Sequence, residues 1–277
     1  MKKKVGIVGL GLIGGSFAKA TTAYTDFEVY GLDINEEIVK RAIDESTINK
    51  ELETSNTVEM DLMLLAVRPG VAKKYIEENP IIRGIVIDLC GVKRDVTETI
   101  LPISLKNQFT YIGGHPMAGR EIGGYNNSSK DLYKGASMIL VPHQNDVPEW
   151  ISQYLYEIGF SNIKISTDEE HDKIIAYTSQ LAHVVSNAFV KSKAAVDHFG
   201  YSADSLKDLT RVATLDSEMW TELFFKNSDN LISEINGLIK ELEKYKYALE
   251  ISDEKELKQL LDSGVVAKQM MYPKEGN

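Results

Sequence analysis

The sequence predicts an α/β protein with an N-terminal Rossmann-type doubly wound sheet followed by an all-α dimerisation domain. Short apolar runs alternate with helical patterns through the first part of the chain, as in sheets with crossover helices. A glycine-rich turn follows the first run. From Asp168 to Lys268 almost everything is helical in pattern, with few glycines and no proline. We therefore expect two domains, residues 1–167 and 168–277.

The apolar runs of the first domain are the expected strands. They cover residues 5–9, 27–32, 61–67, 84–89, 109–113, 138–141 and 162–165. The third and fourth runs are almost continuously apolar, as expected for strands buried on both faces. Helical patterns begin at Ile13 and span 36–44 and 147–158. Strands that alternate with helices in this way predict a parallel sheet.

The second domain opens with a long predicted helix, from Asp168 to about Val196. Thr167 and the acidic residues after it are typical of a helix start. Apolar side chains cover much of this helix's circumference, which indicates central burial. The helical region offers little cover for such a helix, so we expect a second subunit to supply part of it. The predicted assembly is a homodimer.

Composition narrows the function classes. The net charge of −10 argues against nucleic acid as a partner, because phosphate binding needs a basic surface. The single cysteine, Cys90, allows no intramolecular disulfide and favours a reducing compartment, so we expect a cytoplasmic protein. No stretch has enough unbroken apolar residues to span a bilayer, and no membrane partner is expected.

The turn at residues 9–14 matches the pattern Gly-x-Gly-x-x-Gly. An apolar strand precedes it and a helix follows, as the dinucleotide-binding fingerprint requires. The helix N-terminus would bind a pyrophosphate, and Asp33, ending the second strand, would bind the adenosine ribose hydroxyls. A carboxylate there repels the additional phosphate of NADP, so we expect NAD as the cofactor. We expect no metal site. The predicted cofactor-binding residues are Gly9, Leu10, Gly11, Leu12, Ile13, Gly14, Asp33 and Val67.

His115 stands among glycines and a proline in residues 113–119. Glycines let the backbone approach a ligand closely, and Pro116 keeps His115 extended. An imidazole on a stiff, uncrowded loop can take a proton at neutral pH. The alternative is a tight turn whose histidine only satisfies backbone groups.

A polar stripe marks the long helix, where Asp172, Ser179, His183 and Asn187 fall on one side. Such a stripe usually lines a wet cavity or a polar contact. The alternative is that His183 is a hydrogen-bonded core histidine.

Two cations also lie in informative places. Arg211 stands among apolar residues, and a guanidinium can donate two parallel bonds to a carboxylate. It could instead form an ion pair between subunits. Lys93 follows a buried strand, near the sheet edge where open α/β sheets bind ligands. It is either an anion contact or a surface lysine.

Taken together, these motifs resemble the prephenate dehydrogenase family, which also includes arogenate dehydrogenases. The resemblance covers nearly the whole chain. It rests on the glycine fingerprint, residues 113–119, residues 179–183, and residues 208–211 with Trp220 after them. It implies a homodimeric enzyme of tyrosine biosynthesis that uses NAD to oxidise and decarboxylate prephenate, giving 4-hydroxyphenylpyruvate and CO2.

The resemblance also implies residue roles. His115 would be catalytic and would hydrogen-bond the ring hydroxyl of prephenate, and His183 would help to hold the substrate. The other implied contacts are Arg211 to the ring carboxylate, Trp220 from the other subunit at the pocket border, and Glu121 as a gate with Asp208 and Arg211.

The chain departs from the family pattern at two positions. Gly91 stands where the family often has a serine that bonds the catalytic histidine, so we expect His115 to bond water, a backbone group or nothing. Ala182 stands where the family usually has proline, and this change should only straighten the helix.

Three alternatives stay open from the sequence. One is an arogenate dehydrogenase. Another is a β-hydroxyacid-type NAD dehydrogenase, which relies on a lysine of the helical domain, here Lys191 or Lys193. The third is a non-catalytic NAD-binding sensor or dimeric scaffold, which would need neither His115 nor Arg211.

Overall fold

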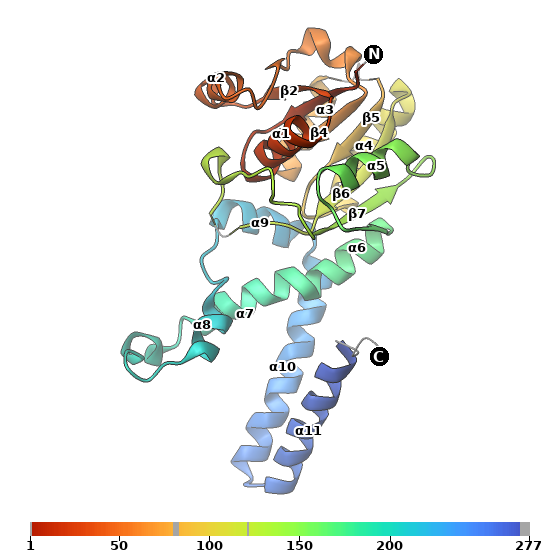
Figure 1. Ribbon diagram of the computed structural model, residues 1–277. Coiled ribbons are helices and arrows are strands. Elements are labelled where there is room, and N and C mark those ends of the chain that lie inside the picture. The colour runs from red at the N-terminus through yellow and green to blue at the C-terminus, as the bar shows by residue number, and fades with distance from the viewer. Residues whose placement is uncertain (1, 80–82, 121, 272–277) are drawn as a thin grey trace, which may run out of the picture. The chain divides into compact units, whose positions relative to one another are not determined.

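The computed structural model describes residues 2–79, 83–120 and 122–271 (Figure 1). The chain divides into two compact units, Met1–Asn227 and Ser228–Asn277. The first unit holds a sheet and the helices up to α9. The second unit is a helical hairpin in which α10 (Ser228–Glu250) and α11 (Glu254–Met271) pack side by side.

An eight-stranded sheet forms the centre of the first unit, with the order β3-β2-β1-β4-β5-β6-β7-β8. Its strands are β1 (Lys4–Val8), β2 (Glu28–Leu32), β3 (Lys50–Glu51), β4 (Leu62–Leu65), β5 (Ile85–Asp88), β6 (Thr110–Pro116), β7 (Ser137–Pro142) and β8 (Asn162–Ile165). Every predicted apolar run overlaps a strand. The two-residue strand β3 was not predicted.

The strands pair in parallel except for β6 with β7, which pair antiparallel. The expectation of a wholly parallel sheet is therefore wrong at this edge. Between β6 and β7 the chain forms turns and the short helix η2 (Tyr125–Asn127). Without a long crossover helix to carry it back, the chain returns along the neighbouring strand.

Helices cover both faces of the sheet (Figure 1). On one face lie α1 (Leu12–Tyr24), α2 (Glu36–Asp44) and α5 (Glu149–Glu157), and on the other lie α3 (Pro69–Glu78) and α4 (Arg94–Asn107). The last two were not predicted, although Pro69 at the first turn of α3 is a typical start signal.

The pleat of β4 divides the core into two layers. Leu62 and Leu64 belong to the cluster that includes Phe17 of α1, whereas Met63 and Leu65 belong to the cluster that includes Ile76 of α3. Successive side chains of a strand point to opposite faces, so a strand buried on both faces must be apolar throughout. This confirms the interpretation of the continuous apolar run.

The long helix after the sheet begins as predicted, because the Thr167 hydroxyl accepts a bond from the backbone N–H of Glu170 at 3.1 Å. It consists of α6 (Asp168–Ile175), the π-helical turn η3 (Ala176–Leu181) and α7 (Ala182–Phe189). It ends well before the predicted Val196.

Within one chain this helix is not fully buried, and the cover by a second subunit stays a prediction. Ile174, Tyr177 and Phe189 are 52%, 49% and 45% exposed. Several half-exposed apolar side chains on one helix form a surface that is suited to cover by a partner.

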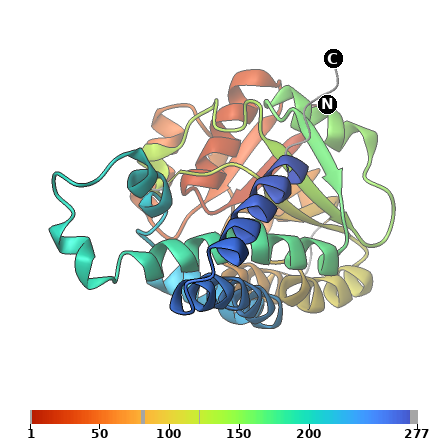
Figure 2. The ribbon, with the colours of Figure 1, turned by 90° about the horizontal axis from the view of Figure 1, so that it is seen from below.

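After α7 the chain turns through η4 (Lys193–Asp197) and returns with α8 (Asp204–Thr210) and α9 (Ser217–Lys226) (Figure 2). The Asp216 carboxylate caps α9 by accepting from the Met219 N–H at 3.0 Å. The remaining short helix is η1 (Thr54–Glu59). No helix in the described part of the chain has the length and apolar character needed to cross a membrane.

The glycine-rich turn joins β1 to α1 through close backbone contacts. Gly9 has φ +89°, a conformation that side chains disfavour. A Cβ on Gly14 would lie 1.8 Å from the Gly9 carbonyl oxygen, whereas a Cβ on Gly11 would meet no atom within 4 Å. Gly14 is therefore required for packing, and Gly11 leaves open space at the N-terminus of α1.

These contacts predict different outcomes for two matched substitutions. Gly14→Ala should lower the free energy of unfolding by about 1–3 kcal/mol or more, because the added methyl overlaps the Gly9 carbonyl. Gly11→Ala should leave stability within about 0.5 kcal/mol. Denaturant unfolding of the cofactor-free protein measures both, and equal stability of the two variants would contradict the packing role of Gly14.

Candidate active site

A cavity of about 970 Å³ opens beside the carboxyl ends of β1, β2, β4 and β5. Open α/β sheets bind ligands at this edge. The loop after β6 and helix α9 complete the wall. Residues of the glycine-rich turn, of the loops after β2, β4 and β5, and of helices α7 and α9 line the cavity. They include Gly9, Gly11, Leu12, Ile13, Asp33, Val67, Cys90, Gly91, His183, Trp220 and Leu223.

Most of the predicted cofactor-binding residues line this cavity, and Leu10 and Gly14 do not. Leu10 is fully buried, and its backbone N–H donates to Asp33 Oδ2 at 2.8 Å. The Asn35 N–H donates to the other carboxylate oxygen at 2.9 Å. These two bonds fix the Asp33 carboxylate at the end of β2.

This end of the cavity fits a dinucleotide. Gly11 leaves space at the N-terminus of α1, where backbone N–H groups attract a pyrophosphate. The Asp33 carboxylate stands where a ribose diol would be bound. The free space at the α1 N-terminus and the Asp33 carboxylate therefore fit an NAD site.

His115 lies in β6, opposite Ile139 of β7, and not on a loop as predicted. A strand makes its backbone at least as rigid as the predicted turn. A Cβ built on cavity-lining Gly91 would lie 4.0 Å from His115 Cε1, so the imidazole stands directly behind this part of the wall. The histidine remains partly exposed.

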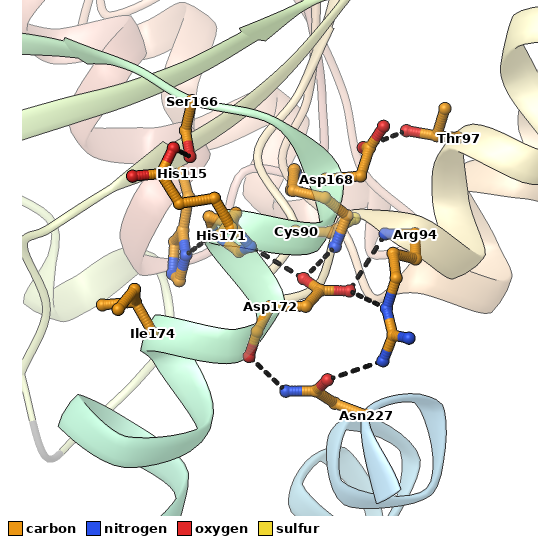
Figure 3. A network of polar contacts seen from close by, with 12 residues as sticks. Cys90, Arg94, Thr97, His115, Ser166, Asp168, His171, Asp172, Ile174 and Asn227 are labelled. Carbon is orange, nitrogen blue, oxygen red and sulfur yellow. Dashed lines mark hydrogen bonds and ion pairs between the residues drawn. The ribbon is translucent and has the colours of Figure 1, made fainter. Parts of the chain in front are cut away.

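A chain of side-chain contacts runs from His115 into the protein (Figure 3). His115 Nδ1 lies 2.9 Å from His171 Nε2, and His171 Nδ1 lies 2.7 Å from Asp172 Oδ1. His171 is 2% exposed and Asp172 is fully buried. The prediction that His115 would bond water, a backbone group or nothing is therefore wrong, because its partner is the imidazole of His171.

Asp172 is held by further donors. The backbone N–H groups of Lys93 and Arg94, at the start of α4, donate to its two oxygens at 2.8 and 3.0 Å. Arg94 Nε lies 3.3 Å from Oδ2. Asn227 Nδ2 donates to the Asp172 carbonyl at 2.8 Å, so the end of α9 is tied to the same point.

The environment lowers the pKa of all three groups. Burial lowers the pKa of His115 well below its usual value, and nearby His171 and Lys93 lower it further. Burial also lowers the pKa of His171, although the bond to Asp172 opposes this. Burial would raise the pKa of Asp172, but the donors around it, His171 first, hold it below its usual value. At neutral pH the arrangement is a carboxylate and two neutral imidazoles.

Lys93 does not contact the cavity, and both predicted roles for it are wrong. Its side chain is fully buried, and Nζ donates to Asp88 Oδ1 and to the Gly114 carbonyl at 2.5 and 2.6 Å. A Cβ on Gly113 would lie 2.9 Å from Lys93 Cδ, and one on Gly114 would lie 2.8 Å from the Asp88 carbonyl oxygen. Gly113 therefore makes room for the buried Lys93 side chain, and Gly114 makes room for the neighbouring strand β5.

His183 and Trp220 line the far part of the cavity, with ring centroids 4.0 Å apart. The His183 Nδ1–H donates to the Ser179 carbonyl at 2.8 Å, so Nε2 of the neutral ring is an acceptor. In this chain Trp220 lines the same cavity as His183, and a contribution of Trp220 from the other subunit stays a prediction. The predicted stripe does not act as one surface, because the Asn187 side-chain amide donates to the Ala213 carbonyl and the Asp172 carboxylate accepts from Lys93, Arg94 and His171. The π-helical turn between them changes the helical register.

Arg211 follows α8 and is exposed. It is not among the cavity-lining residues, although its neighbour Val212 is. Glu121, the predicted gate, lies outside the described residues. His171 was not predicted from the sequence, although the pair His171-Asp172 stands near the start of a predicted helix.

Two family models match the chain. Residues 17–160 match the prephenate dehydrogenase nucleotide-binding domain, and residues 167–263 match the prephenate dehydrogenase dimerization domain. A prephenate dehydrogenase of Lactococcus lactis subsp. cremoris is 27% identical over 99% of this chain and 79% of its own. A cyclohexadienyl dehydrogenase of Zymomonas mobilis is 29% identical over 91% of this chain and 90% of its own.

Solved structures agree with these matches. Prephenate dehydrogenase from Aquifex aeolicus, in complex with hydroxyphenyl propionate and NAD+, superposes with a TM-score of 0.85 and 28% identity. The alignment covers 98% of this chain and 99% of that chain. Arogenate dehydrogenase from Synechocystis shares the fold, with a TM-score of 0.78 and 23% identity over 97% and 99% of the two chains.

The fold and the site together define an NAD-dependent oxidoreductase built from a nucleotide-binding domain and a helical domain. Within this class, the two family matches are decisive because together they span most of the sequence. The chain belongs to the prephenate dehydrogenase family.

The fixed carboxylate of Asp33 predicts cofactor preference. The protein should bind NAD at least about tenfold more tightly than NADP, because the 2′-phosphate would meet a negative charge. Asp33→Asn should narrow the ratio of the two dissociation constants, and Asp44→Asn, at the exposed end of α2, should not. A native preference for NADP, measured by fluorescence titration, would remove this role from Asp33.

Proposed function

We propose that the chain catalyses the oxidative decarboxylation of prephenate to 4-hydroxyphenylpyruvate and CO2 with NAD, in tyrosine biosynthesis, and that His115 is its general base. One observation carries the proposal. An imidazole whose pKa is lowered by burial stands directly behind Gly91, and Gly91 lines the cavity that the dinucleotide-binding turn also lines. The matches to prephenate dehydrogenases supply the substrate.

His115 can perform the proton step that this reaction needs. NAD, when bound beside the glycine-rich turn, accepts the hydride from the carbon that bears the hydroxyl. That hydroxyl becomes more acidic as the hydride leaves, and neutral His115 takes its proton. The ring then loses its carboxylate as CO2 and becomes aromatic, so the protein need only orient the ring and bind the anion.

The substrate contacts remain proposals. His183 and Trp220 line the cavity and would border the substrate ring, with His183 Nδ1 bonded to the Ser179 carbonyl. We assign the ring carboxylate to Arg211, whose neighbour Val212 lines the cavity, with Glu121 as a gating acid. The match to a dimerization domain and the exposed apolar residues of α6 to α7 support a homodimer. The single cysteine supports a cytoplasmic enzyme.

The alternatives differ in what they need from the site. A β-hydroxyacid-type enzyme needs a lysine at the substrate, but Lys191 and Lys193 are exposed and do not line the cavity. Arogenate would use the same proton step as prephenate. NADH formation with prephenate, with arogenate and with simple hydroxy acids decides among these substrates, and binding of NADH without any turnover would indicate a sensor.

Substitution of His115 tests the base. His115→Asn should lower kcat by about 10²–10⁴, the usual contribution of a general base, with little change in KM for prephenate. His198→Asn is the matched control, because His198 is exposed and bonds Ser202 in the segment after α7. A raised KM with normal kcat in His115→Asn would mean that the residue binds substrate without taking its proton.

The lowered pKa of His115 predicts the pH dependence. A group whose pKa is lowered keeps its neutral, basic form at pH values below the ordinary histidine value of about 6.5. The acid limb of kcat/KM for prephenate should therefore lie below about pH 6.5. A half-maximal value at about pH 7 or above, under conditions where the enzyme stays folded, would be inconsistent with this base.

A further inference from the structure

We propose that His171 and Asp172 are positioning residues that hold His115 in one tautomer, with a proton on Nδ1 and none on Nε2. The kinetic consequence rests on the proposed function, in which Nε2 accepts the substrate proton. The tautomer itself does not depend on that function.

The buried carboxylate of Asp172 fixes the first proton. An ionised carboxylate has acceptors only, and Asp172 already accepts from the backbone N–H groups of Lys93 and Arg94. His171 Nδ1, 2.7 Å from Oδ1, must therefore carry a proton and donate it. The carboxylate fixes the tautomer of the first imidazole.

The second step follows from the neutrality of His171. This ring is 2% exposed, and burial lowers its pKa, so one nitrogen carries a proton and the other does not. Because Nδ1 carries the proton, Nε2 is an acceptor. His115 Nδ1, 2.9 Å away, must then donate to it. The remaining nitrogen of His115, Nε2, is unprotonated.

The same contacts act during the reaction. The substrate hydroxyl gives its proton to His115 Nε2, and the Nδ1 proton stays in its bond to His171 Nε2. The charged groups near this pair are Lys93 and Asp88, which bond each other, and Asp172. An imidazolium at His115 therefore keeps an acceptor in a site where burial would otherwise disfavour the charge.

The native protein provides a test that needs no active-site variant. In the NAD-bound enzyme labelled with ¹⁵N-histidine, the neutral His115 ring should show a protonated Nδ1 and an unprotonated Nε2. The chain has five histidines, and loss of one signal set in His115→Asn assigns the ring. A neutral ring with the proton on Nε2 would overturn the proposal.

Two substitutions of His171 test the effect on catalysis. His171→Leu removes the acceptor, so His115 should populate the other tautomer and kcat should fall at least about tenfold with KM for prephenate nearly unchanged. His171→Gln keeps an oxygen acceptor and should recover most of the lost kcat and the native tautomer. Equal kcat in the native enzyme and in His171→Leu would contradict the positioning role.

His143 provides the matched control. It is a second enclosed histidine with a carboxylate neighbour, Asp168 at 3.6 Å, and it does not contact His115. His143→Leu should cost stability without changing the tautomer of His115. If His143→Leu changes the tautomer as much as His171→Leu does, the effect is general loosening and the proposal fails.

The outcomes also separate this inference from the proposed function. Full kcat in His115→Asn, together with the expected tautomer, would reject the base and leave the positioning contacts intact. A large loss of kcat in His115→Asn, together with an unchanged tautomer in His171→Leu, would reject the positioning pair and leave the base intact.

Discussion

The site depends on the hydrogen bonds that the buried carboxylate of Asp172 accepts. It accepts hydrogen bonds from two backbone N–H groups at the start of α4 and from His171, and Arg94 adds its side chain. Removing one partner from such a group leaves an unpaired charge or donor in the interior, which is costly. These bonds hold α6 against the start of α4. The same carboxylate therefore stabilises the fold and positions His171 beside His115.

The interior of the site is polar in an ordered way. Asp88 and Lys93 pair behind the glycines of β6, and Tyr111 donates to the second oxygen of Asp88 at 2.9 Å. The sequence suggested Lys93 as an anion contact, but in the structure it is buried and paired with Asp88. This network places charge near His115 and leaves the ring only partly exposed, and burial holds the pKa of this histidine low, so the ring stays neutral.

Local signals in the sequence predicted much of this structure. The glycine-rich turn, Asp33 and the cap at Thr167 depend on neighbours in the chain, and all were recognised. The partner of His115 is 56 residues away, and no periodicity shows which buried imidazole faces it. The direction of β7, the burial of Lys93 and the π-helical turn likewise depend on tertiary packing, which overrides local preference.

The central claim is that His115 faces the reacting hydroxyl with Nε2 while His171 holds Nδ1. A crystal structure of the chain with NAD and a hydroxyphenyl analogue of the substrate measures this directly. We expect His115 Nε2 at about 2.6–3.2 Å from the analogue's hydroxyl oxygen, with the Nδ1 contact to His171 retained. An analogue bound with its hydroxyl away from His115, or a His115 ring turned so that Nδ1 no longer meets His171, would contradict the account.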